Sequence, residues 1–176
     1  MAGRSINAAV VLLVALTVWV PPLLAASAVQ EPGVTTSAPA ASPWFGRWEQ
    51  DLATAVRWYE SPPYKRVTLR IEPWKDGLRV IYDMVRTRGG VTHVEWDGRF
   101  DGRDYPVQGI DSPMTNAYRR VDERSYQIVV KVDGREAATA TAVVSRDGAT
   151  LTVTTIERGS SGQKAVSTAM YRRVRG

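Results

Sequence analysis

Five Asp-Gly pairs and one Gly-Gly pair divide most of the chain into short segments. The Asp-Gly pairs stand at residues 76–77, 97–98, 101–102, 133–134 and 147–148, and the Gly-Gly pair stands at 89–90. Asp-Gly suits the two central positions of a type I′ turn, because both positions need a positive φ angle. Between alternating apolar residues, such a pair is a strong local signal for a β-hairpin. The spacing therefore predicts consecutive antiparallel strands.

The segments between these pairs alternate apolar and polar residues. The alternation is clearest in five ranges: 67–71, 78–84, 126–132, 138–144 and 151–153. A period of two places each apolar set on one side of a pleated sheet. We predict an all-β fold, an antiparallel up-and-down barrel of about 8–10 strands, because closing the sheet removes its exposed edges. A β-sandwich is the alternative.

One segment departs from this alternation. In residues 51–59 the apolar side chains recur at helical spacing, and the two prolines at 62–63 would end a helix there. The positions concerned are Leu52, Ala55, Val56 and Tyr59. We therefore predict one short helical segment after the first strand.

The first 28 residues have the layout of a signal peptide. Arg4 supplies a basic n-region, Ala8–Val20 is mostly apolar, and residues 26–28 read Ala-Ser-Ala, a typical cleavage site. The apolar run is shorter than the ~20 residues that a membrane span needs. We expect cleavage after Ala28 and a secreted or periplasmic protein of the cell envelope. An uncleaved anchor is the alternative.

Residues 29–42 are predicted to be a flexible tether. They consist mainly of Ala, Pro, Ser, Thr, Gly and Val, without an aromatic residue or a periodicity. Such a segment cannot bury enough apolar surface to offset the entropy of ordering. The single folded domain is therefore expected to span residues 43–176.

Composition excludes several kinds of chemistry. The chain has no cysteine and a single histidine, His93. Disulfides, thiolate catalysis and sites with several histidine ligands are therefore impossible. A catalytic triad would need His93, and no Gly-x-Ser-x-Gly turn is present to hold a nucleophile. We predict that the protein is not an enzyme and uses no cofactor, with a hydrolase built on converging acids as the alternative.

Two sets of polar side chains resemble metal ligands only superficially. The first set shares one face of a predicted strand and consists of His93, Glu95 and Asp97. Since the other face carries Val94 and Trp96, we expect the polar face to be solvated. The second set is the acidic series Asp97, Asp101 and Asp104. Its spacing differs from that of calcium loops, and turn chemistry explains its Asp-Gly pairs. We predict no metal site.

Basic residues exceed acidic ones, with 23 Lys and Arg against 18 Asp and Glu. The arginines are spread over many predicted strands, so they form no concentrated basic stripe of the kind that binds nucleic acid. We expect no nucleic-acid partner. A weak, salt-sensitive attraction to an anionic cell envelope is the partner that this charge favours, and we expect a monomer.

Three motifs resemble those of a family of bacterial exported lipocalin-like proteins. The first is Phe45-Gly-Arg-Trp48, the second Phe100-Asp-Gly-Arg-Asp-Tyr-Pro-Val-Gln-Gly109, and the third Val144-Ser-Arg-Asp-Gly-Ala-Thr-Leu-Thr-Val153, followed by Gly162-Gln163. The resemblance covers roughly residues 43–174. The chain departs from the family at residues 49–51 and within 53–60, near the expected barrel entrance.

The resemblance implies a calycin-type barrel that binds a small apolar ligand, and it carries over no catalytic residue. It also implies that Trp48 packs against an arginine near the last strand, for which Arg172 and Arg173 are the candidates. We predict a ligand such as a hydrophobic small molecule or lipid, and eight residues that line its site: Leu69, Tyr82, Trp96, Ile128, Val130, Leu151, Val153 and Met170. The alternative is an envelope-associated interaction or inhibitor module with a filled barrel.

Overall fold

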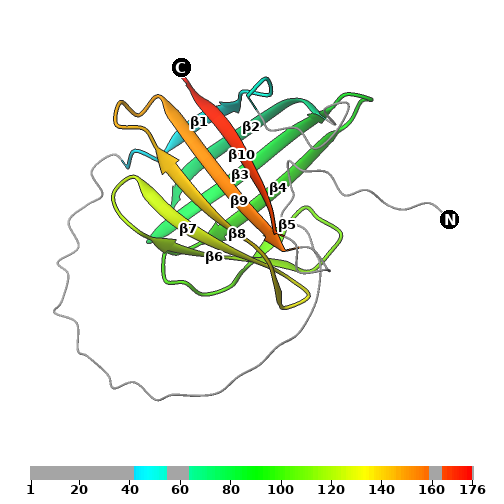
Figure 1. Ribbon diagram of the computed structural model, residues 1–176, viewed down its shortest axis with the longest axis vertical. Helices are drawn as coiled ribbons and strands as arrows, with labels where there is room; N and C mark the ends of the chain where they lie inside the picture. Colours follow the sequence, from blue (N-terminus) through cyan, green and yellow to red (C-terminus); the bar gives the residue numbers. More distant parts are fainter. Residues whose placement is uncertain (1–41, 55–63, 159–163, 176) are drawn as a thin grey trace, which may run out of the picture.

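In a computed structural model, residues 42–54, 64–158 and 164–175 are described, and they form one closed antiparallel barrel (Figure 1). Each strand pairs with the next one along the chain, and the first pairs with the last. The strands of the described residues are β1 (Gly46–Gln50), β2 (Tyr64–Trp74), β3 (Gly77–Arg86), β4 (Val91–Gly98), β5 (Tyr105–Gln108), β6 (Met114–Arg120), β7 (Ser125–Val132), β8 (Arg135–Val144), β9 (Thr150–Arg158) and β10 (Lys164–Val174). The predicted all-β, up-and-down barrel is confirmed, and the sandwich alternative is wrong.

The helical segment predicted after the first strand does not appear in the described residues. After β1, the chain turns at residues 52–54, where the backbone N–H of Thr54 donates to the carbonyl oxygen of Asp51. The Asp51 carboxylate accepts a hydrogen bond from the backbone N–H of Ala53 at 3.1 Å. Such local bonds from an aspartate compete with helix formation. The rest of the predicted helix, residues 55–59, lies outside the described residues.

The predicted signal peptide and nearly all of the predicted tether also lie outside the described residues. In the part of the chain that the structure does describe, no helix is long and apolar enough to cross a membrane.

The Asp-Gly pairs play different parts. Asp133 and Gly134 form the predicted two-residue turn, with φ angles of 50° and 74°, and they join β7 to β8. Between β2 and β3 the turn lies one residue earlier, because Gly77 already pairs with Trp74. Here the close approach of the β4 backbone, not the turn, explains the glycine: a Cβ atom on Gly77 would lie 1.9 Å from the carbonyl oxygen of Gly98. Gly98 itself belongs to β4 rather than to a turn.

One end of the barrel is closed by tryptophans from the N-terminal part of the domain. Trp48 is completely buried, and its indole N–H donates to the carbonyl oxygen of Trp44 at 3.0 Å. The guanidinium carbon of Arg173, from β10, lies 4.1 Å from the centre of the Trp48 ring. The predicted contact between Trp48 and an arginine is therefore confirmed, and Arg173 provides it. Arg172 points to the other face, where it pairs with Asp51 at 2.9 Å.

Arg173 also ties together three chain segments. Its guanidinium donates hydrogen bonds to the carbonyl oxygens of Pro43 at 2.5 Å, Phe45 at 2.6 Å and Gly148 at 2.7 Å. These bonds fix the segment before β1 and the loop between β8 and β9 against the last strand. A planar guanidinium can stack on an indole and make such bonds at once, which a lysine ammonium cannot do.

We therefore expect Arg173→Lys to lower the free energy of unfolding by about 2 kcal/mol, through loss of charged hydrogen bonds and of stacking. The matched control is Arg172→Lys, which changes an exposed ion pair and should cost less than ~0.5 kcal/mol. Urea unfolding followed by tryptophan fluorescence measures both variants. Equal effects of the two substitutions would contradict the role assigned to Arg173.

Candidate functional site

The strand register shows which side chains line the inside of the barrel, here called the lumen. Trp48 pairs with Leu69, and Leu69 pairs with Tyr82, so the three share one face. Trp48 and Leu69 are fully buried, which identifies this face as the inner one. Following the paired residues from strand to strand around the barrel assigns each remaining strand residue to the inner or the outer face.

Seven of the eight residues predicted to line the site lie on this inner face. Leu69, Trp96, Ile128, Val130 and Leu151 are buried, and Tyr82 and Val153 are half-buried. The prediction for Met170 is wrong, because Met170 pairs with Thr152 on the outer face. A shift of one residue moves a strand side chain to the other side of the sheet. In β10 the inner face belongs to Ala169 and Tyr171, and Tyr171 pairs with Leu151.

The lumen contains four tyrosines, of which the sequence analysis identified only Tyr82. The others are Tyr118 on β6, Tyr126 on β7 and Tyr171 on β10, and all three are buried. The hydroxyl groups of Tyr82 and Tyr171 are hydrogen-bonded to each other across the barrel. Tyr171 stands two residues before Arg173, and residues two apart on a strand point to the same face. Pairing Arg173 with the inward-facing Trp48 could therefore have assigned Tyr171 to the inner face.

Aromatic rings continue from this tyrosine quartet (Tyr82, Tyr118, Tyr126 and Tyr171) to the closed end. Tyr118 stacks on Trp96 with ring centres 4.0 Å apart, and it lies 5.1 Å from Tyr126. Tyr126 in turn lies 4.1 Å from Trp44. Contacts at these distances add to the free energy of area burial. This chain of rings fills the lumen toward the closed end.

Burial changes the acidity of the quartet. Burial of the hydroxyl raises the pKa of Tyr82 to about 12, while its hydrogen bond with Tyr171 acts in the opposite direction. The pKa values of Tyr118, Tyr126 and Tyr171 are also raised, mainly by burial and secondarily by neighbouring tyrosines. An apolar environment disfavours the charged phenolate. At neutral pH the four hydroxyl groups are therefore uncharged donors and acceptors of hydrogen bonds.

A part of the lumen wall next to Tyr126 and Tyr171 is made of small side chains. On β8 and β10 the inner face carries Ala138, Ala140, Ala142, Ala165, Ser167 and Ala169. In the barrel, β9 lies between these two strands and pairs with both (Figure 1). The three alanines of β8 are buried, whereas Ala165, Ser167 and Ala169 of β10 keep part of their solvent exposure.

Several inner-face residues keep part of their solvent exposure. Val153 and Ala169, which pair with each other, are half-buried, although both point into the barrel. The same holds for Tyr82, Gln50 and Asn116. In contrast, the inner residues near the closed end, such as Leu151 and Leu78, are fully buried. Solvent therefore reaches the lumen beside β9 and β10 but not its closed end.

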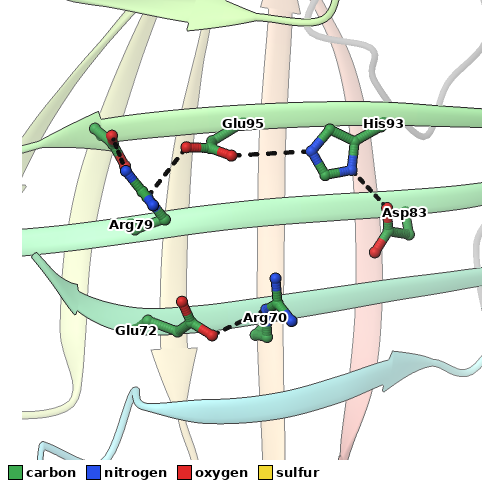
Figure 2. Close-up of polar contacts among 7 residues, drawn as sticks. Arg70, Glu72, Arg79, Asp83, His93 and Glu95 are labelled. Atoms are coloured by element: carbon green, nitrogen blue, oxygen red, sulfur yellow. Dashed lines mark hydrogen bonds and ion pairs between the residues drawn. The ribbon is translucent and has the colours of Figure 1, made fainter.

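The outer face of β2, β3 and β4 carries a network of charges (Figure 2). Arg79 pairs with Asp97 at 2.6 Å and Glu95 at 3.1 Å, and His93 contacts Asp83 at 2.7 Å. The predicted solvent-facing side of this strand is confirmed for His93, which is exposed, while Val94 and Trp96 are buried on the other side. Within the described residues, no three potential ligands are grouped as a metal would require.

The acidic side chains at positions 97, 101 and 104 are bound by other residues of the protein. Asp97 binds Arg79, Asp101 accepts a hydrogen bond from the hydroxyl of Tyr105 at 2.9 Å, and Asp104 pairs with Lys131 at 2.7 Å. Backbone hydrogen bonding by Arg103 is the main cause that lowers the pKa of Asp101. These contacts are those of turns and surface ion pairs.

A groove of about 580 Å³ lies outside the closed end. The groove is lined by Ser42, Pro43 and Phe45, by the loop 147–150, and by Arg172, Arg173 and Arg175 at the C-terminal end of the barrel. Two of these arginines are already engaged, Arg172 by Asp51 and Arg173 by three backbone carbonyls. The groove therefore has little free bonding capacity, and the lumen is the stronger candidate for a binding site.

This chain matches no protein-family model and no curated protein. The resemblance to exported lipocalin-like proteins thus depends on the sequence motifs alone and stays a prediction.

The tyrosine quartet predicts alkaline instability. The pKa of tyrosine is about 10 in an unfolded chain, and it is higher in the folded barrel, so the unfolded state binds fewer protons above that pH. Stability should therefore be constant below about pH 10 and fall above it, by up to ~1.4 kcal/mol per pH unit for each shifted tyrosine. Urea unfolding between pH 8 and 11.5 measures this slope. Tyr126→Phe removes one of the titrating groups, so it should make the decrease of stability with pH less steep by the contribution of one proton. An unchanged slope would contradict the raised pKa of Tyr126.

Proposed function

We propose that this protein is a lipocalin-like binding protein that holds a small apolar or amphipathic molecule in its lumen. The observation that carries the proposal is the partial exposure of inner-face residues, notably Tyr82, Val153 and Ala169. Side chains that point inward and yet meet solvent mark an interior with room beside them. Barrels of about this strand number are wide enough to hold one small ligand.

The chemistry of the lumen supports an amphipathic ligand. The small wall of β8 and β10 and the apolar Val153 would cover an apolar body, at ~25 cal/mol for each Å² removed from water. The uncharged hydroxyl groups of the tyrosine quartet would orient a polar end. Ligand pockets commonly combine an apolar lining with a few placed polar groups. Nothing in this role requires catalysis or a cofactor, and we propose neither.

A filled barrel that acts as an envelope-associated interaction or inhibitor module is the second candidate. The observation that favours it is the chain of rings from Trp96 through Tyr118 and Tyr126 to Trp44, which occupies the lumen near the closed end. That chain reaches the β8 side of the small wall, where Tyr126 pairs with Ala142, and its ring contacts come from Trp44 and from residues of β4, β6 and β7. The space beside this wall decides between the two candidates.

Two substitutions on neighbouring residues test the lumen. Ala169→Phe adds a ring on the inner face of β10, and Met170→Phe adds one on the outer face of the same strand. We expect Ala169→Phe to weaken binding of an apolar fluorescent probe at least about tenfold, by occupying its space. Met170→Phe should leave the affinity unchanged.

The same pair of variants also tests the filled-barrel candidate. If the lumen is filled, Ala169→Phe overpacks it and costs about 1–3 kcal/mol of stability, and no probe binds to the unsubstituted protein. Native mass spectrometry of protein purified from its own host should show a bound small molecule. Absence of any adduct, together with absence of probe binding, would contradict the binding proposal.

We further propose that the protein is exported through its N-terminal segment and acts outside the cytoplasm as a monomer. The basic Arg4, the apolar run at 8–20 and the Ala-Ser-Ala site support this proposal. Its net positive charge would favour weak, salt-sensitive association with an anionic envelope.

Export predicts a defined new N-terminus. Intact-mass analysis of protein from the extracellular or periplasmic fraction should show a chain that begins at Val29. Ala28→Asp should block cleavage and retain the full-length chain with the membrane fraction, because the site needs small residues. Recovery of the mature-length protein from the cytoplasm alone would contradict export.

A further inference from the structure

We propose that the lumen selects a neutral amphiphile whose polar end is a hydroxyl group, bound between Gln50 and the hydroxyl pair of Tyr82 and Tyr171. This inference rests on the proposed binding function and adds the chemical class of the ligand and the place of its polar end. It is carried by a buried acceptor without a partner and by a hydroxyl proton that stays free beside it.

The acceptor is the side-chain amide oxygen of Gln50. Gln50 stands two residues after Trp48 on β1, so it shares the inner face with that residue. Its Oε1 atom is buried and has no hydrogen-bond partner among the described residues. A buried acceptor is costly to leave unpaired, so this oxygen calls for a donor from another molecule.

The free proton belongs to the hydroxyl pair of Tyr82 and Tyr171. These two hydroxyl groups are hydrogen-bonded to each other. That bond uses one of their two protons, and no other described residue accepts the second one. Burial raises the pKa of Tyr82 to about 12, so at neutral pH the pair is uncharged and offers one hydrogen-bond donor.

Strand pairing brings the acceptor and the donor together. Gln50 of β1 pairs with Tyr171 of β10. The Cβ atoms of such a pair lie about 4.5–5.5 Å apart, so both side chains extend into the lumen from neighbouring points of its wall. A group that bridges them must donate to an amide oxygen and accept from a tyrosine hydroxyl. A hydroxyl group does both, because it has one donor and two acceptor positions.

The arginines of the inner face do not favour a carboxylate at this place. The nearest one along β10 is Arg173, which is stacked on Trp48 and bound to three carbonyl oxygens. The other arginines on the inner face of the described strands are exposed at strand ends: Arg86, Arg120 and Arg135. A buried carboxylate would therefore meet no free cation here, and burial of an unpaired charge is costly.

An ammonium group would lack a counter-charge as well. The carboxylate on the inner face of the described strands is Glu157, near the end of β9. It stands six residues after Leu151, the residue of β9 that pairs with Tyr171. Glu157 is therefore at the other end of the lumen from the polar groups that would bind the ligand, and a neutral end suits the site best.

The apolar part of the ligand would lie along β10 and β9. Ala169 stands two residues before Tyr171 and pairs with Val153, and both keep part of their solvent exposure. Ala165 and Ser167 continue the same face of β10 and are also half-buried. Solvent thus reaches the surface next to Tyr171, and an alkyl chain or ring would displace it.

Four probes of similar size test this selectivity at pH 7.5: octanol, its isomer 1-methoxyheptane, octanoate and octylamine. Displacement of an apolar fluorescent probe and calorimetry give their dissociation constants. We expect octanol to bind at least about fivefold more tightly than the ether, which accepts hydrogen bonds but cannot donate one to Gln50. Octanoate and octylamine should each bind at least about tenfold more weakly than octanol.

Variants locate the effect. Gln50→Leu should weaken octanol about fivefold and leave the ether unchanged, so that the preference disappears. The double variant Tyr82→Phe/Tyr171→Phe should weaken both ligands, because both accept from the tyrosine pair. The matched control is Asn116→Leu, which removes another buried and unpartnered amide oxygen on β6, five strands from β1 in the barrel. It should change neither affinity.

The outcomes separate this inference from the proposed function. If octanol and the ether bind the unsubstituted protein equally, or if either charged probe binds more tightly than octanol, the hydroxyl class is wrong and binding in the lumen stands. If none of the four probes binds, the proposed function itself fails. If Gln50→Leu raises stability in urea without changing the preference for octanol, internal water serves Oε1 and the role of Gln50 is wrong. The comparison in the unsubstituted protein decides even where a variant does not fold.

Discussion

The barrel depends on the contact between Trp48 and Arg173, because it joins the first strand to the last and closes one end. A closed sheet has no free edges, and this closure is sealed by a buried indole under a guanidinium 4.1 Å away. The same guanidinium holds three backbone carbonyls. The chain has no cysteine, so no disulfide can replace this contact. Stability comes instead from closure and from the rings packed above Trp48.

Closing one end leaves the two walls of the lumen different. Large rings extend from Trp44 to Trp96 near the closed end, and the inner faces of β8 and β10 carry alanines and one serine next to them. Among the described residues, the buried amide oxygens of Gln50 and Asn116 have no hydrogen-bond partner; Gln50 pairs with Tyr171, and Asn116 stands two residues before Tyr118. Pairing these oxygens within the protein would add stability, because a buried acceptor without a partner is costly.

Much of the architecture could be predicted because strand signals are local. The period of two placed Leu69, Ile128 and Leu151 on the inner face before any pairing was known. The same reasoning failed for Met170, because Val166, Thr168 and Met170 alternate in size on the outer face. In β10 both faces carry apolar or small residues, so alternation alone cannot assign the inner one. The tyrosine quartet was also missed, since its members come from four separate strands.

The sequence by itself determined the strand number to within a narrow range, the Asp133-Gly134 turn, the polar face of His93 and the partner class of Trp48. These follow from periodicity, backbone preferences and motifs, which are properties of neighbouring residues. The tertiary structure alone decided that Arg173 rather than Arg172 covers Trp48, that Tyr82 meets Tyr171, and that Glu157 lies on the inner face of β9. Those facts depend on register around a closed barrel, and register is set by all ten strands together.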